Sequence, residues 1–152
     1  MSSSCATAPT IRTKADTDPL NLANVAQQRQ FNDAGRAKAR EIGAALKKLG
    51  IPVGQVITSQ YFRAIETGRL LGFGEPQPTA DVAEGGQVVT PIENNRRTAA
   101  MRKLAATAVP GTNVVVVSHK PNILDAFGKD WFAGGYRLVA RVQADEWAKL
   151  AQ

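Results

Sequence analysis

The sequence predicts one α/β domain, a three-layer sandwich in which a mostly parallel sheet carries helices on both faces. First, helix and strand patterns alternate along the chain, as they do in folds of this class. Second, Val114–Val117 is an uninterrupted run of four valines, which is typical of a strand buried on both faces. Third, 152 residues with 43% hydrophobic content suit a single core.

The first 31 residues are polar and rich in turn formers, which predicts an extended or loop-rich start. We expect residues 1–15 to be a leader with the remnant of a first strand, and residues 16–152 to form the single domain. The first firm element is a helix that begins at Asn32 or Asp33, either of which can act as its cap. Apolar residues follow at one-face spacing, and Gly50 predicts the end of the helix.

Val53–Ser59 is predicted to be a short buried strand, and Tyr61–Leu71 a helix that stops at Gly72. Residues 74–86 contain two prolines and several glycines, which predicts a loop.

A second long helix is predicted to start at Thr90, because a cap hydroxyl, a proline and then Glu93, which can reach back to the cap, follow one another there. Its apolar face is expected to comprise Met101, Leu104, Ala105 and Ala108. The valine strand comes next.

The end of the chain is predicted to form three elements. Pro121–Phe127 has the pattern of a short helix, residues 136–142 alternate as a strand with one polar side, and residues 145–151 close the chain as a helix.

Composition narrows the classes of function. The net charge of +6 favours an anionic ligand. The alternative is that the basic residues form a solvated surface without a ligand. The basic residues lack the interleaved aromatic side chains of single-stranded nucleic-acid platforms, so we expect no nucleic-acid partner. The single cysteine excludes an internal disulfide framework and a Cys-rich metal site, and the single histidine excludes multi-His zinc sites. No stretch approaches the roughly 18 apolar residues of a membrane helix.

Two predicted strand ends carry residues that suit phosphate. The strand that ends at Ser59 leads into a helix with Arg63 in its first turn, and the valine strand delivers His119 to the start of the next helix. Ligands of parallel sheets bind beyond the carboxyl ends of the strands, and helix N-termini favour anions. Arginine grips two phosphate oxygens with its planar fork. A lone histidine after a strand is also compatible with a structural role.

Three segments resemble motifs of the histidine phosphatase superfamily, which has the phosphoglycerate mutase-like fold. Phe31–Ala39 is similar to its L-T-x-x-G-x-x-Q-A helix start, and Thr58–Thr67 to its S-S-P-x-x-R-A-x-E-T segment. Val114–Asn122 is similar to its apolar strand that ends in S-H or G-H. The three motifs occur in the family's order and cover about residues 16–147. The superfamily includes cofactor-dependent phosphoglycerate mutases and small phosphohistidine phosphatases.

The resemblance implies catalysis through a phosphohistidine, with no metal or organic cofactor. It places Arg63 and His119 on the transferred phosphoryl group. Arg12 corresponds to the arginine of the family's R-H-G motif, and Thr13 stands where the nucleophilic histidine is expected. Glu84 matches the glutamate that protonates the leaving oxygen; the alternative is an exposed loop carboxylate.

The expected function is therefore a phosphatase that hydrolyses phosphomonoesters or phosphohistidine, with a phosphorylated small molecule or a phosphoprotein as substrate. The alternative is an inactive pseudoenzyme that binds phosphate or a phosphoprotein. The chain departs from the family at Thr13 and by a short segment at residues 130–135. We consider three explanations: a pseudoenzyme, a natural or engineered deletion variant, and a longer protein with further loop residues. The expected compartment is the bacterial cytoplasm, or the periplasm if a signal peptide has been removed.

Overall fold

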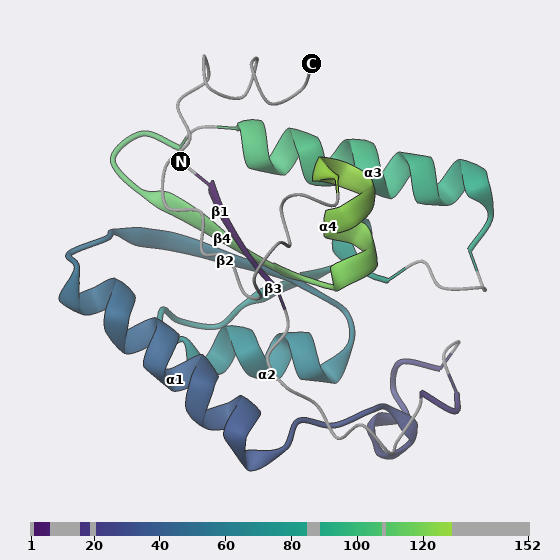
Figure 1. The fold of residues 1–152 in the computed structure, drawn as a ribbon, viewed down its shortest axis with the longest axis horizontal. Helices are drawn as coiled ribbons and strands as arrows, with labels where there is room; N and C mark the ends of the chain where they lie inside the picture. Colours follow the sequence, from purple (N-terminus) through teal and green to yellow (C-terminus); the bar gives the residue numbers. More distant parts are fainter. Residues whose placement is uncertain (1, 7–15, 19–20, 85–88, 108, 129–152) are drawn as a thin grey trace.

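In the part of the chain that the computed structural model describes, four parallel strands form one sheet (Figure 1). The structure describes residues 2–6, 16–18, 21–84, 89–107 and 109–128. In spatial order the strands are β1, β4, β2 and β3. Their bounds are Ser2–Ala6 for β1, Val53–Ser59 for β2, Gln77–Thr79 for β3 and Asn113–Ser118 for β4.

Helices cover both faces of this sheet (Figure 1). One face carries α1 (Asp33–Lys48) and α2 (Phe62–Leu70), and the other carries α3 (Pro91–Ala106) and α4 (Lys120–Phe127). Two short 3-10 helices, η1 (Val25–Gln27) and η2 (Ala80–Val82), lie in the connections. The predicted three-layer α/β architecture is confirmed.

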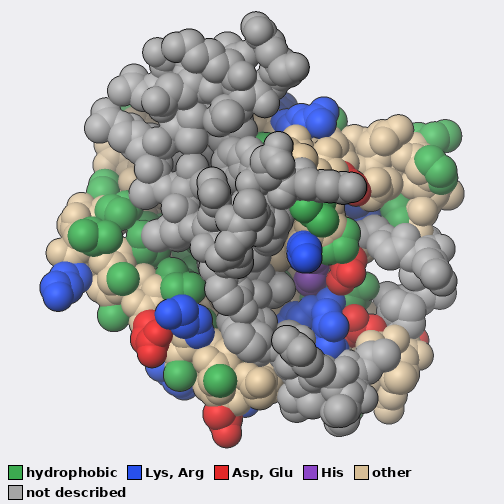
Figure 2. All heavy atoms as spheres, in the orientation of Figure 1, with side chains coloured by type: hydrophobic (Ala, Val, Ile, Leu, Met, Phe, Trp, Pro, Cys, Tyr) green, Lys and Arg blue, Asp and Glu red, His purple; other side chains and the backbone are tan. Residues whose placement is uncertain are grey.

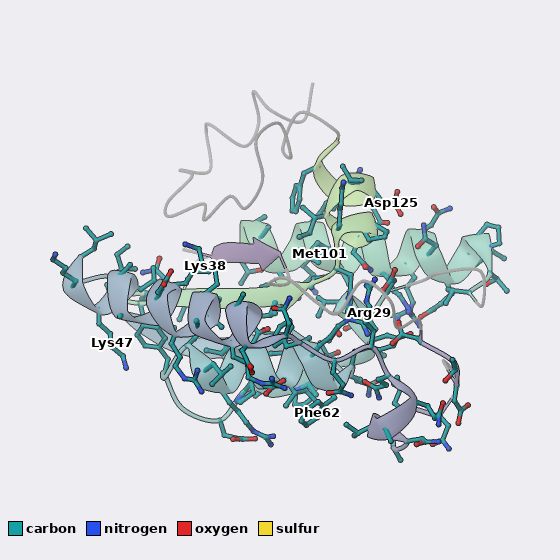
Figure 3. The ribbon with its side chains drawn as sticks, turned by 60° about the horizontal axis from the view of Figure 1, so that its bottom comes forward. Arg29, Lys38, Lys47, Phe62, Met101 and Asp125 are labelled. Carbon is teal, nitrogen blue, oxygen red and sulfur yellow. The ribbon has the colours of Figure 1, made fainter. Side chains whose placement is uncertain are left out.

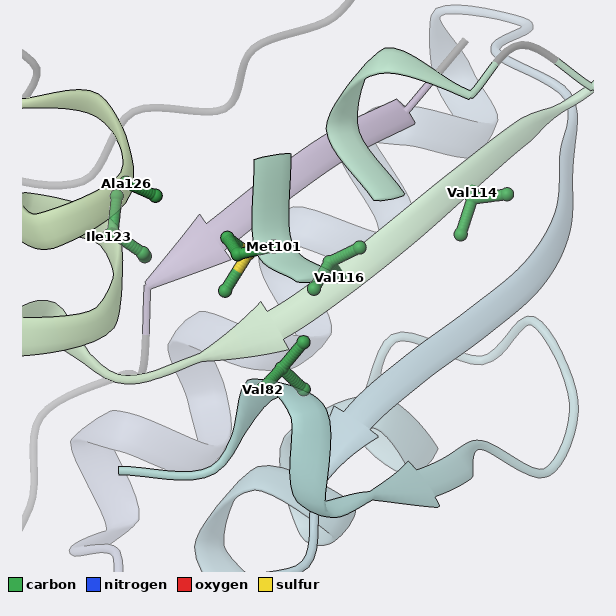
Figure 4. Packing of buried hydrophobic residues seen from close by; sticks show 6 residues of the cluster. All are labelled: Val82, Met101, Val114, Val116, Ile123 and Ala126. Carbon is green, nitrogen blue, oxygen red and sulfur yellow. The ribbon is translucent and has the colours of Figure 1, made fainter. Parts of the chain in front are cut away.

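The valines of β4 explain why the strand shows no alternation in the sequence. Val115 and Val117 pack into the core on the side of α1 and α2, whereas Val114 and Val116 pack into the core on the side of α3 and α4. Every residue of β4 is buried. Figure 4 shows the second of these cores, in which Val116 lies beside Met101 and α4 contributes Ile123 and Ala126.

The predicted helix boundaries are set by local hydrogen bonds. The Asn32 side chain caps α1 by accepting from the Gly35 amide at 2.8 Å, and the positive φ of 65° at Gly50 ends the segment as predicted. The Thr90 hydroxyl caps α3 by accepting from the Glu93 amide. The Glu93 carboxylate does not reach back to the cap: it binds two arginines of its own helix instead.

We expected a remnant of a first strand within residues 1–15, and β1 lies in this range, where it pairs with β4 with Ala6 opposite Ser118. Residues 74–86, which we expected to be a loop, contain β3 and η2, and β3 pairs with the other side of β2. Both strands are short and lie at the edges of the described sheet, so backbone hydrogen bonds to a neighbour stabilise them without a hydrophobic pattern. Pro78 fits such an edge position, since it has no N–H to donate.

Some predictions lie outside the described residues. These are Arg12, Thr13, the strand predicted at residues 136–142 and the helix predicted at residues 145–151. Of the helices that the structure describes, none has the length and apolar character needed to cross a membrane.

Candidate functional site

The candidate site lies at the carboxyl ends of β4 and β2, which are neighbours in the sheet (Figure 1). Ser59 is the last residue of β2, Arg63 sits in the first turn of α2, and His119 follows β4. Glu84 follows η2. Three predicted site residues, Arg63, His119 and Glu84, therefore come together, as parallel strands require of residues at their carboxyl ends.

Arg63 is a buried cation held between two carboxylates. Its side chain is 0% exposed; its Nη1 lies 2.8 Å from Oδ1 of Asp16, and its Nη2 lies 3.1 Å from Oε2 of Glu84. Its guanidinium carbon stacks 4.4 Å above the centre of the Tyr61 ring. The buried Nε has no hydrogen-bond partner among the described residues. The Nε–H of this guanidinium is therefore a buried donor that no described group satisfies.

His119 is almost fully buried, with 2% of the residue exposed. Its Nε2 lies 2.6 Å from the Ser59 hydroxyl, and its Nδ1 lies 3.6 Å from Oε2 of Glu84, which is beyond hydrogen-bond length. The Tyr61 ring packs edge-on against the imidazole, with 5.1 Å between the two ring centres. Burial, and then the charges of Arg63 and Arg29, lower the pKa of His119 to about 3. The imidazole is therefore neutral at physiological pH.

The segment that carries Glu84 is fixed by three side chains from the α3 and α4 side of the sheet. The Ser118 hydroxyl donates to the carbonyl of Val82 at 2.8 Å, and the Asn122 amide donates to the carbonyl of Ala83 at 2.7 Å. Arg97 Nη1 donates to the carbonyls of Ala83 and Glu84, each at 3.2 Å. The position of Glu84 beside Arg63 thus follows from tertiary contacts.

Two residues that the sequence analysis did not select complete the electrostatics. Oδ1 of Asp16 accepts from the Arg29 amide at 2.8 Å as well as from Arg63. Arg29 lowers the pKa of His119 through its charge, and its buried Nε has no partner in the described part of the chain. The signal that could have found Arg29 is its place just before the Phe31–Ala39 motif. Figure 3 shows Arg29 far from Lys47, which lies in the last turn of α1.

Ser59 and Tyr61 were also missed as site residues, although both lie in or beside the motif around Arg63. Ser59 carried a signal, since it ends a predicted strand at the edge where ligands bind. In Figure 2 the histidine, drawn in purple, is visible between basic side chains in blue and acidic side chains in red. His119 is the chain's single histidine, so the charged surroundings seen there are those of the candidate site.

The arrangement suits an anion. Oε2 of Glu84 is shared, since it lies 3.1 Å from Arg63 Nη2 and 3.6 Å from His119 Nδ1. An oxygen of a bound anion in the same place would meet a guanidinium and an imidazole together. Within the described residues no group of three or more His, Cys, Asp or Glu side chains is placed to hold a metal ion. Arg12 and Thr13 lie outside the described residues, so their placement beside this site stays a prediction.

Several solved structures share this fold. The protein histidine phosphatase SixA, solved with tungstate, superposes with a TM-score of 0.57 and 17% identity over 82% of this chain and 72% of its own. The product of an open reading frame of Mycobacterium tuberculosis superposes with a TM-score of 0.63 and 16% identity over 91% of this chain and 95% of its own. A phosphoglycerate mutase from Plasmodium falciparum superposes with a TM-score of 0.50 and 14% identity over 92% of this chain and 89% of its own.

No protein-family model matches the sequence, and no curated protein matches it. At these identities the similarity shows the fold alone. The expected phosphoglycerate mutase-like fold, shared with histidine phosphatases, is confirmed.

Proposed function

We propose that the site binds the phosphoryl group of a phosphorylated ligand and hydrolyses it, as a phosphatase of the histidine phosphatase type. One observation carries the proposal: a single carboxylate oxygen of Glu84 lies between Arg63 Nη2 and His119 Nδ1. Two nitrogen atoms of almost fully buried side chains from different elements therefore face one anionic oxygen, and their burial strengthens charge interactions.

Each residue has a proposed role toward the phosphoryl group. Arg63 and Arg29 neutralise the charge that develops on its oxygens, which is the main contribution of a protein to phosphoryl transfer. Neutral His119 donates one hydrogen bond. Glu84 leaves the anion position when the ligand binds, and in its protonated form it gives a proton to the leaving oxygen. The bond to that oxygen breaks as a nucleophile bonds to phosphorus; in histidine phosphatases the nucleophile is the histidine of the R-H-G motif, at the position that Thr13 holds here. Arg12 adds a further guanidinium.

The ligand class follows from the fold and the charges. Among proteins of this fold, SixA is a protein histidine phosphatase and was solved with tungstate, an oxyanion like phosphate. The net charge of +6 favours the approach of anions. A phosphorylated protein or small molecule is therefore the proposed substrate.

A binding-only function is the second candidate, and one observation favours it. His119 is the only histidine of the 152 residues, and Thr13 stands where the nucleophile is expected. Threonine attacks phosphorus only when a neighbouring base activates it. Because His119 is proposed to bind the phosphoryl group rather than to attack it, the phosphohistidine route has no nucleophilic histidine among these 152 residues, whereas phosphate binding needs none.

Two assays on the same variants decide between these candidates. Turnover of an aryl phosphate is measured beside calorimetric binding of inorganic phosphate, for wild type, Arg63→Ala and His119→Ala. Arg69→Ala is the matched control, because Arg69 lies on the same helix with an exposed side chain. Turnover lost in both site variants and kept in the control supports the phosphatase. Phosphate binding without turnover supports the binding module, and wild type that does neither refutes both.

A further inference from the structure

The two ring nitrogens of His119 have different neighbours. Nε2 lies 2.6 Å from the Ser59 hydroxyl, and Nδ1 faces Oε2 of Glu84 at 3.6 Å. A neutral imidazole carries one ring proton, and the nitrogen that holds it is the only donor. The location of this proton decides what His119 offers to a ligand.

The hydrogen bonds of Ser59 indicate that Nε2 accepts. Ser59 is fully buried, and its oxygen already accepts from the Tyr61 amide at 3.3 Å. The hydroxyl proton needs an acceptor, and Nε2 is the contact that the described structure places within reach. If Nε2 carried the proton instead, the Ser59 oxygen would accept twice, and its own proton would be buried without a partner, which is unfavourable.

The charge on the other side of the ring points the same way. A carboxylate oxygen of Glu84 at 3.6 Å from Nδ1 attracts a proton on that nitrogen and repels a lone pair. Arg63 contacts the same carboxylate oxygen, and the Tyr61 ring packs edge-on against the imidazole, so these neighbours define the direction in which Nδ1 faces.

We propose that Ser59 is a positioning residue that keeps the proton of His119 on Nδ1 by donating to Nε2, so that Nδ1–H faces the anion position beside Arg63. The assignment of phosphate as the anion rests on the proposed function, whereas the location of the proton does not. With the opposite tautomer a lone pair would face the incoming phosphoryl oxygen and repel it.

The chain's single histidine makes the test direct, because a two-bond ¹H–¹⁵N NMR spectrum contains one imidazole. For wild type we expect a protonated Nδ1 and an unprotonated Nε2. In Ser59→Ala we expect the two nitrogen shifts to move toward each other as the tautomers mix. Phosphate should bind about tenfold more weakly, a loss of one charge-assisted hydrogen bond. Ser59→Thr keeps the hydroxyl and should restore both readouts.

Thr58→Val is the matched control. Thr58 is the neighbouring buried residue of β2, and its hydroxyl has no partner among the described residues. The substitution removes a buried hydroxyl from the same strand and should leave the tautomer and phosphate affinity at their wild-type values.

Two results would overturn the inference: a proton on Nε2 in wild type, or a folded Ser59→Ala variant with unchanged nitrogen shifts and phosphate affinity. If Ser59→Ala does not fold, the wild-type spectrum still decides the tautomer. Wild type with its proton on Nδ1 but no response to phosphate leaves the assignment of the tautomer intact and refutes the proposed function.

Discussion

Replacing Arg63 by methionine removes the cation from between two carboxylates while keeping most of the apolar stem. The Arg63 side chain is 0% exposed, whereas those of Asp16 and Glu84 are 20% and 27% exposed. Removing one partner of a buried ion pair costs about 3–5 kcal/mol. Because water reaches both carboxylates in part, we expect the lower end, about 3 kcal/mol.

Urea unfolding followed by circular dichroism measures this loss. With a slope of about 2 kcal/mol per molar urea, the midpoint of Arg63→Met should fall by about 1.5 M. The control is Arg69→Met, on the same helix, whose ion pair with Glu75 is exposed and should contribute about 0.5 kcal/mol or less. Adding Asp16→Asn and Glu84→Gln to Arg63→Met should recover part of the loss, since no unpaired carboxylates remain. Equal midpoints for Arg63→Met and Arg69→Met would refute the claim that the buried guanidinium is held as an ion.

Three further outcomes follow from the packing and the charges. Gly43→Ala should lower the thermal midpoint of unfolding, because an added Cβ would lie 2.1 Å from the backbone oxygen of Leu71. Relieving this overlap requires the two backbones to move apart, which costs free energy. Met101→Ala should cost about 3 kcal/mol in urea unfolding, whereas Ile92→Ala on the same helix, where 83% of the residue is exposed, should cost close to nothing. Folding lowers the pKa of His119 from 6.5 to about 3. Between these two pH values the unfolded chain binds a proton on His119 and the folded chain does not, so the free energy of unfolding should fall as the pH drops through this interval. Urea midpoints across this interval should fall less steeply for His119→Gln, and identical slopes would contradict the lowered pKa.

Elements with local sequence signals were predicted well. Asn32 and Gly50 predicted the ends of α1 because capping and a positive φ depend on one or two residues. The strand β3 was missed, and β1 was expected only as a strand remnant without bounds, because pairing with a neighbour defines both strands. Their residues show no hydrophobic alternation, so no local pattern distinguishes them from loops.

The same division holds within the site. Arg63 and His119 were predicted because both follow strands at the edge where ligands of parallel sheets bind. Asp16 contacts Arg63 across 47 positions of the chain, and Ser59 contacts His119 across 60. Such contacts depend on the register of the sheet and on loop paths, and one sequence carries no local signal for either.

The register of β2 and β4 determines which side chains can meet at the site. The two strands pair at Val53 opposite Asn113 and, after an irregularity, from Gln55 opposite Val114 to Thr58 opposite Val117. Ser59 lies one residue and His119 two residues beyond the last pair, so the register brings both residues to the same end of the ladder. A slip of one residue would turn Ser59 to the opposite face of the sheet and leave Nε2 of His119 without its hydroxyl. The valine run thus fills both cores, and the register of its pairing with β2 holds the hydroxyl against the ring on which the proposed anion site depends.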